Sequence, residues 1–225
     1  MRRFARENGL GLFFLVVFLL TLVGQSFAGQ RAFNVDQRAH GDTTLTWAHY
    51  LVSTSFGGAV MENWQSEFLQ FSLFILATVW LTQKGSNESK VLEDAGLESD
   101  RKQRVGAHAP DGAPRLAKLA GGLRRWLYEN SLLIAMTTIF FSTWFAQSLN
   151  NWKVFNAEQR SHDGGTLSWG QYVLNADFWE RSLQNWQSEF LAVATMVIFT
   201  IYLRQRGSPE SKPVGAPHDE TASSG

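Results

Sequence analysis

Long apolar runs alternate with strongly polar segments along this chain. The runs at 9–27 and 131–149 contain no charged residue, and each is close to the roughly 20 residues that cross about 30 Å of hydrocarbon as a helix. Two separate uncharged runs of this length are uncommon in soluble folds. The pattern therefore predicts a transmembrane helix at each place, and the alternative is a soluble four-helix protein with buried helices.

Two shorter runs, at 68–81 and 190–203, have 14 uncharged residues each. This length is ambiguous, because buried helices of soluble proteins contain similar runs. The helices reach spanning length only if they begin earlier, near Asn63 and Asn185. Together with the longer runs, they predict an all-α membrane protein with four transmembrane helices.

Most of the chain is a tandem repeat. Residues 2–90 align without a gap onto 124–212 at a constant offset of 122, and the seven residues from Asn63 to Leu69 recur letter for letter from Asn185 to Leu191. A repeat of this length marks a structural unit that is used twice. Because each unit contains two spans, the two helical hairpins should have parallel orientation and be related by a pseudo-two-fold axis along the membrane normal.

Polar segments separate the two units. Gly, Pro, Ser and mixed charge dominate 85–122 and 207–225, which predicts a flexible linker and a disordered tail. We therefore expect four parts: repeat 1 at 1–84, the linker at 85–122, repeat 2 at 123–206 and the tail at 207–225.

The first apolar run also resembles a secretory signal peptide. Arg2, Arg3 and Arg6 precede it, and it ends on Ser26-Phe27-Ala28, with small residues where such peptides are cleaved. The same unit recurs at Arg124, inside the chain, where a signal peptide cannot operate. The repeat therefore favours a first helix that is retained.

Basic residues gather on one side of the four runs. They are Arg2, Arg3, Arg6, Lys84, Lys90, Lys118, Arg124, Arg125, Arg204, Arg206 and Lys212. The loops inside each repeat hold fewer basic residues. The positive-inside rule then places both termini and the linker in the cytoplasm. The loop that joins the two spans within each repeat is expected on the extracytoplasmic side. This predicts a multi-pass protein of the bacterial inner membrane.

Composition excludes several classes of function. The 20 basic and 20 acidic residues give a net charge of zero, which offers no concentrated basic surface for nucleic acid. The absence of cysteine excludes disulfides, thiolate metal sites and a cysteine nucleophile. No nucleophile–base motif, phosphate loop or metal-binding spacing predicts an enzyme or a cofactor. The expected partners are the lipid bilayer and either a second copy of the chain or another envelope protein.

The two copies agree best on the extracytoplasmic side. All seven residues from 63 to 69 match their counterparts, whereas only three positions match across 9–24. Lipid-facing positions accept any apolar residue, so sequence drift is expected there. In the outer loop, Trp47, Tyr50 and Leu51 share one helical face, and the second copy repeats the pattern. This predicts short interfacial helices in an ordered outer cap.

The candidate polar cap site combines the repeated polar side chains of this side. Its members are Glu67, Glu189, Arg38, Arg160, His40, His162, Asn63, Asn185, Gln25 and Gln147. On helical spacing Asn63 and Glu67 share a polar face, to which Gln25 and Gln147 are expected to hydrogen-bond.

Three interpretations of this site remain open. In the first, Glu67 pairs with Arg38 or His40 and fixes the loop to the helices, which is a structural role. In the second, the paired glutamates Glu67 and Glu189 bind a cation or relay a proton. In the third, two histidines and two glutamates bind zinc, a set that is acceptable by ligand type but lacks a helical metal-binding spacing. The prediction adopted here is no metal and no catalytic residue.

The doubled Asn-Trp-Gln-Ser-Glu-Phe signature, at Asn63–Phe68 and Asn185–Phe190, resembles an uncharacterised family of bacterial membrane proteins classed as a domain of unknown function. The resemblance covers both repeats. It implies a bacterial inner-membrane location and brings no activity, substrate or cofactor.

Three functions are compatible with these features. The preferred hypothesis is a structural or interaction protein of the bacterial envelope with an ordered extracytoplasmic cap. A small channel or transporter that uses Glu67 and Glu189 is the alternative, weakened because the span interiors contain no charge. A membrane enzyme is the least favoured of the three.

Overall fold

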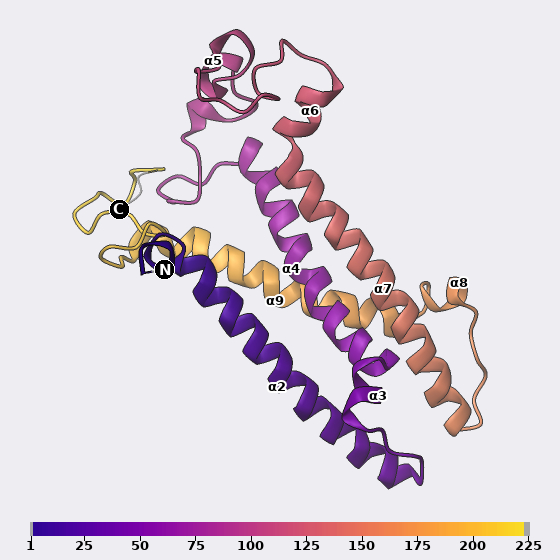
Figure 1. The fold of residues 1–225 in the computed structure, drawn as a ribbon. Coiled ribbons are helices and arrows are strands. Elements are labelled where there is room, and N and C mark those ends of the chain that lie inside the picture. The colour runs from indigo at the N-terminus through magenta and orange to yellow at the C-terminus, as the bar shows by residue number, and fades with distance from the viewer. Residues whose placement is uncertain (1, 223–225) are drawn as a thin grey trace. The chain divides into compact units, whose positions relative to one another are not determined.

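The computed structural model describes residues 2–222, and over this range every regular element is helical (Figure 1). The elements are α1 (Arg2–Glu7), α2 (Gly9–His40), α3 (Trp47–Leu51), α4 (Thr54–Trp80), η1 (Leu92–Asp94), α5 (Asp100–Gln103), η2 (Gly106–His108), α6 (Leu123–Glu129), α7 (Ser131–Ser161), α8 (Trp169–Tyr172) and α9 (Ala176–Tyr202). No strand occurs in this part of the chain, which confirms the all-α prediction there.

Helices α2 and α7 are long and apolar, with 32 and 31 residues. In their most apolar windows only 6% and 22% of the residues are buried inside the protein. Large side chains such as Leu10, Phe13 and Leu20 are exposed instead. Such a surface is unfavourable in water and stable in hydrocarbon. Both helices could cross a bilayer, which suggests a membrane protein, although the helix near the N-terminus also fits a signal sequence.

Helices α4 and α9 correct the prediction of four apolar spans. Each has 27 residues and begins well before its uncharged run, at Thr54 and Ala176. The Asn, Gln, Ser and Glu residues of the repeated seven-residue segment therefore lie inside the helices and make their first halves polar. Within residues 2–222 only two helices, α2 and α7, are apolar enough to span a membrane.

Contacts divide the chain into two compact units. Unit 1 contains Met1–Val60 and Ala146–Tyr172, and unit 2 contains Met61–Phe145 and Val173–Gly225. Unit 1 therefore holds α2, α3, α8 and the C-terminal half of α7. Unit 2 holds α9, most of α4 and the whole segment between α4 and α7. Each unit draws on both repeats, and the four-part division made from the sequence stays a prediction.

The segment predicted as a flexible linker makes specific contacts within unit 2. Arg125 of α6 is buried, and its guanidinium pairs with Asp100 Oδ1 at 2.5 Å and Glu129 Oε1 at 2.6 Å. It also donates to the carbonyl of Ala120 at 3.0 Å. The hydrogen bond with Asp100, followed by that with Glu129, raises the pKa of Arg125 above its ordinary value. A permanently charged side chain thus ties α5 and the end of the linker to α6.

Candidate functional site

The first cap loop, residues 41–46, joins α2 to α3. Gly41 ends α2 with φ of 77°, the left-handed region that glycine favours, and its N–H donates to the carbonyl of Arg38 at 3.2 Å. The buried amide of Asn34 then spans the loop: Nδ2 donates to Leu45 O at 2.9 Å and Oδ1 accepts from Leu45 N at 2.8 Å. One side chain thus satisfies both backbone groups of Leu45 and fixes the loop to α2.

Aromatic residues of α3 complete this contact. Trp47 Nε1 donates to Ser26 Oγ at 3.0 Å, which places the indole against α2. Tyr50 is 5% exposed and packs against Phe33, and burial raises the pKa of its phenol. The short helix predicted at these positions is therefore present as α3 and is held by specific contacts, and its interfacial location stays a prediction.

The second cap loop, residues 163–168, makes the same contacts with α7. Asn156 Nδ2 donates to Leu167 O at 2.8 Å, and its Oδ1 accepts from Leu167 N at 2.8 Å. Trp169 Nε1 donates to Ser148 Oγ at 3.1 Å, and Tyr172 is completely buried. The two cap loops thus share the asparagine and tryptophan hydrogen bonds, although only Thr44 and Leu45 of the first loop recur in the second.

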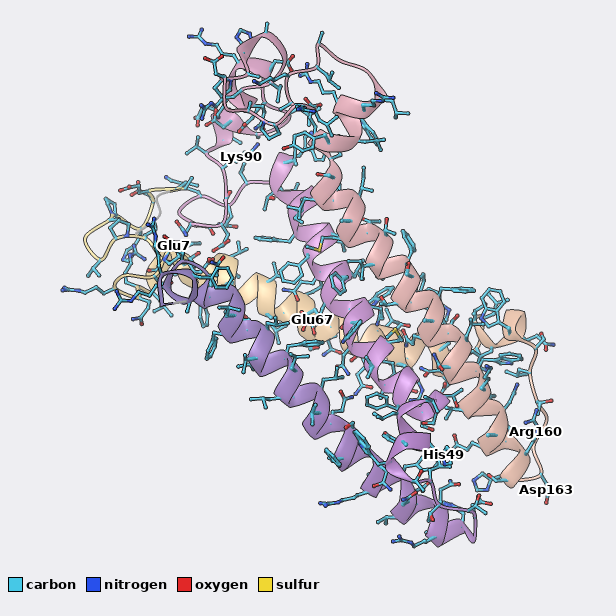
Figure 2. The ribbon with its side chains drawn as sticks, in the orientation of Figure 1. Glu7, His49, Glu67, Lys90, Arg160 and Asp163 are labelled. Atoms are coloured by element: carbon cyan, nitrogen blue, oxygen red, sulfur yellow. The ribbon has the colours of Figure 1, made fainter. Side chains whose placement is uncertain are left out.

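The ten residues of the predicted polar cap site fall into both units. Gln25, Arg38, His40, Gln147, Arg160 and His162 belong to unit 1, and Asn63, Glu67, Asn185 and Glu189 belong to unit 2. Contacts between the two groups, including the expected pair of Glu67 with Arg38 or His40, therefore stay predictions. Within unit 1 the rings of His40 and His162 lie 6.1 Å apart between centroids. Within unit 2 the carboxylates of Glu67 and Glu189 interact electrostatically (Glu67 is labelled in Figure 2).

Gln147 differs from its copy Gln25. Gln147 is fully buried, and neither atom of its amide group has a hydrogen-bond partner in the described part of the chain. Gln25 is only half-buried. Leaving a buried amide unpaired is unfavourable by about 1–3 kcal/mol, so Gln147 marks a position where the cap is not satisfied by the chain itself.

The repeated seven-residue segment supplies a contact that the sequence did not predict. Gln65 is completely buried in unit 2, and its Oε1 accepts a hydrogen bond from Trp186 Nε1 at 2.7 Å. This bond joins α4 to α9. Glu62 of α4 adds an ion pair to Arg181 of α9 at 3.6 Å. The sequence comparison had marked Gln65 as identical in the two copies, but its burial depends on the opposing helix.

Two further loops are equivalent in sequence, and they follow α4 and α9. These post-helix loops, residues 83–90 and 205–212, share the pattern Gln-x-Gly-Ser-x-Glu-Ser-Lys. Gly85 and Gly207 both take positive φ, 83° and 81°. Ser89 Oγ accepts from Gln83 N at 2.7 Å, and Ser211 Oγ accepts from Gln205 N at 2.9 Å. The backbone of the two loops is therefore alike.

The lysines that end the post-helix loops have different surroundings. Lys212 is 1% exposed, and its ammonium lies within hydrogen-bond distance of four carbonyls, those of Gly85 (2.7 Å), Pro217 (3.1 Å), His218 (3.0 Å) and Glu220 (3.0 Å). Burial, followed by the positive charge of Arg204, lowers its pKa. Lys90 is about one-third exposed, donates to Gly96 O at 3.2 Å and pairs with Glu98 at 3.4 Å. Only Lys212 therefore joins its own repeat to the other post-helix loop.

The two post-helix loops contact each other within unit 2. Asn87 Nδ2 donates to the carbonyl of Pro209, its own counterpart in the repeat, at 3.1 Å. Glu88 and its counterpart Glu210 also interact, through a side-chain hydrogen bond and through their charges. Burial, then the negative charge of Glu210 and a hydrogen bond with it, raise the pKa of Glu88. The composition of these segments had predicted disorder, and the signal that identifies the loops is the repeat of their polar pattern at the end of the alignment.

These side chains make hydrogen bonds, ion pairs and buried contacts within the described residues. In residues 2–222 no cluster of three or more His, Asp or Glu side chains is arranged to hold a metal ion. A family model described as a domain of unknown function (DUF6766) matches residues 1–223. No curated protein and no solved structure matches the chain.

Proposed function

The chain belongs to the DUF6766 family, and from this premise we propose that it is a multi-pass protein of the bacterial inner membrane with a structural or interaction role. In this proposal α2, α4, α7 and α9 form two hairpins of the same orientation. The termini and the linker are cytoplasmic, and both cap loops are extracytoplasmic.

Helix length supports four spans where apolarity alone supports two. The 27 residues of α4 and of α9 correspond to about 40 Å of helix, more than the roughly 30 Å of hydrocarbon. Their polar first halves would lie at the outer membrane face. The hydrogen bond between Trp186 and Gln65 satisfies two of the polar groups there.

The single observation that carries a structural role is the duplicated asparagine clamp of the cap loops. Asn34 and Asn156 use both atoms of the amide group on the backbone of their own loops. Polar side chains that make such hydrogen bonds fix the conformation of the cap loops and are not available for catalysis. An ordered outer surface suits contact with a second copy of the chain or with an envelope protein, and the proposal assigns no catalytic activity.

Pairing of equivalent residues supports the pseudo-two-fold arrangement. Asn87 contacts its counterpart Pro209 in unit 2, and His40 lies beside its counterpart His162 in unit 1. Contacts between equivalent positions are expected where a two-fold axis passes.

The orientation of the chain in the membrane can be tested by cysteine labelling, because the chain contains no cysteine of its own that would react. Thr44→Cys and Thr166→Cys place single thiols at equivalent exposed positions of the two cap loops. We expect a membrane-impermeant maleimide to label both in whole cells, and to label the control Glu93→Cys in the linker only after permeabilisation. Protection of either cap position in whole cells would contradict the topology.

The structural role is tested on the clamp itself. Asn34→Ala and Asn156→Ala should each destabilise the purified protein by about 1–2 kcal/mol, because each leaves the N–H of Leu45 or Leu167 without its acceptor. The carbonyls of the two leucines keep a second donor, Gln30 Nε2 or Trp152 Nε1. The double variant should also lose co-purifying envelope proteins or its own oligomer. Thr43→Ala, at an exposed position of the first cap loop, is the control. A double variant that keeps its stability and its partners would refute the role.

A channel or transporter is the second candidate, favoured by the electrostatic interaction of Glu67 with Glu189. Two carboxylates near one another in a membrane helix pair could bind a cation. Purified protein in liposomes should then conduct protons or a common cation, and Glu67→Gln with Glu189→Gln should abolish the flux. Absence of flux in the wild type decides for the structural role.

A further inference from the structure

Two histidines that are equivalent in the repeats lie together in unit 1. His40 is the last residue of α2, and His162 follows the last residue of α7. Their ring centroids are 6.1 Å apart and the ring planes are nearly perpendicular, at 85°. Both side chains are exposed. Figure 2 labels Arg160 and Asp163, which flank His162 at the start of the second cap loop.

The hydrogen bond of His40 fixes which ring nitrogen is free. Its Nδ1 lies 3.0 Å from the carbonyl oxygen of Asp36, and the Asp36 carboxylate is 3.5 Å from the same nitrogen. A carbonyl only accepts, so Nδ1 carries the proton and donates. The lone pair is then on Nε2. Histidines that bind metals usually donate their other nitrogen to a carbonyl or carboxylate in this way.

The separation of the two rings fits a shared metal ion. Metal–nitrogen bonds of about 2.0–2.1 Å place the centroids of two imidazoles on one ion about 5–6 Å apart. The observed centroid separation of 6.1 Å lies just above that range, so both exposed side chains must adjust to direct a nitrogen at one ion. Because imidazole suits zinc, copper and nickel, the chemistry of the pair selects these ions over calcium or magnesium.

We propose that His40 and His162 form a two-histidine binding site for a late transition-metal ion, Zn²⁺, Cu²⁺ or Ni²⁺. Water fills the remaining coordination positions, because the described residues contain no group of three or more His, Asp or Glu side chains that could hold the ion. The bound ion connects the C-terminal ends of α2 and α7 and so couples the two cap loops of unit 1.

The test uses the full-length protein in detergent, purified through a tag without histidine. Titration calorimetry with Zn²⁺ or Cu²⁺ alone should give one ion per chain. His40→Gln and His162→Gln should each weaken binding by roughly tenfold or more. His49→Gln is the matched control, because His49 belongs to the same outer loop but has a glutamine, Gln171, as its counterpart. It should leave binding unchanged.

Coordination distinguishes a shared ion from adventitious binding to a single ring. Electron paramagnetic resonance of the Cu²⁺ form should show two nitrogen ligands in the wild type and one in either variant. One nitrogen in the wild type, or an affinity that neither variant changes, would overturn the proposal. Helical content measured without metal confirms that both variants are folded.

Discussion

The cap loops and the post-helix loops differ in what duplication has preserved. In the cap loops, Asn34 and Asn156 make the same pair of hydrogen bonds, with distances that agree within 0.1 Å. Each cap loop is therefore bound to the helix that precedes it in its own repeat. In the post-helix loops, identical residues share a backbone but not an environment. Lys212 is enclosed by carbonyls, whereas Lys90 is partly exposed beside Glu98.

The comparison shows how the range of a contact determines whether it survives in both copies. Asn34 contacts a residue only 11 positions away, within its own repeat, so each copy of the sequence carries the complete contact. Lys212 contacts Gly85, 127 positions earlier, and the tail that follows. Of the four carbonyls around Lys212, only that of His218 has a counterpart beside Lys90, the carbonyl of Gly96.

The largest difference in stability between equivalent residues is expected at the two lysines. Lys212→Met should destabilise the protein by about 2 kcal/mol, because it leaves buried carbonyls without a charged donor. Lys90→Met should cost less than about 1 kcal/mol, since its ion pair is partly solvated. Thermal unfolding in detergent, followed by tryptophan fluorescence, measures both. Equal losses would mean that the two post-helix loops have the same role.

The equivalent glycines give a second, smaller contrast. Alanine is strained at the positive φ of either residue. Gly207→Ala should therefore destabilise the protein by about 1 kcal/mol, since no other group lies within 4 Å of the added carbon. Gly85→Ala should cost about 2 kcal/mol, because its Cβ would also collide with the carbonyl of His218. The difference between the two melting temperatures measures the tail contact. A Gly207→Ala variant less stable than Gly85→Ala would contradict it.

The smallest expected effect is a dependence on pH at Glu88. Burial and the neighbouring Glu210 raise the pKa of Glu88 in the folded protein. The folded state therefore holds this proton more tightly, and the associated stability is present below the ordinary carboxyl pKa of about 4.3 and lost as the pH rises through the raised value. Glu88→Gln should remove this loss of stability at high pH. The melting temperature of the variant should therefore exceed that of the wild type by a margin that grows between about pH 4 and pH 8.

The matched controls for this pH dependence are carboxylates of the same region. Glu210→Gln removes the neighbouring charge and should give part of the same advantage, whereas Glu93→Gln, at an exposed position of η1, should give none. A difference between Glu88→Gln and the wild type that is constant over this pH range would show that Glu88 keeps its ordinary pKa in the folded state.

Much of the fold could be predicted from apolar runs and from the repeat. The uncharged runs at 9–27 and 131–149 lie in α2 and α7, and the spacing of Trp47 and Tyr50 indicated the short helix α3. The polar start of α4 and α9 was underestimated, because a run of uncharged residues does not reveal how far a helix extends beyond it. The burial of Lys212 was also missed, because its segment has the composition of a disordered tail and one of its partners, Gly85, is distant in sequence.

By itself the sequence determined where the apolar helical segments lie and which residues exist in two copies. These properties depend on neighbouring residues and on a periodicity that local backbone geometry imposes. Only the tertiary structure decided that Gln65 accepts a hydrogen bond from Trp186, that Lys212 is buried and that His40 meets His162. Burial and pairing depend on chain segments more than 100 positions apart, and the same residue letter is compatible with a solvated or an enclosed side chain until those segments pack.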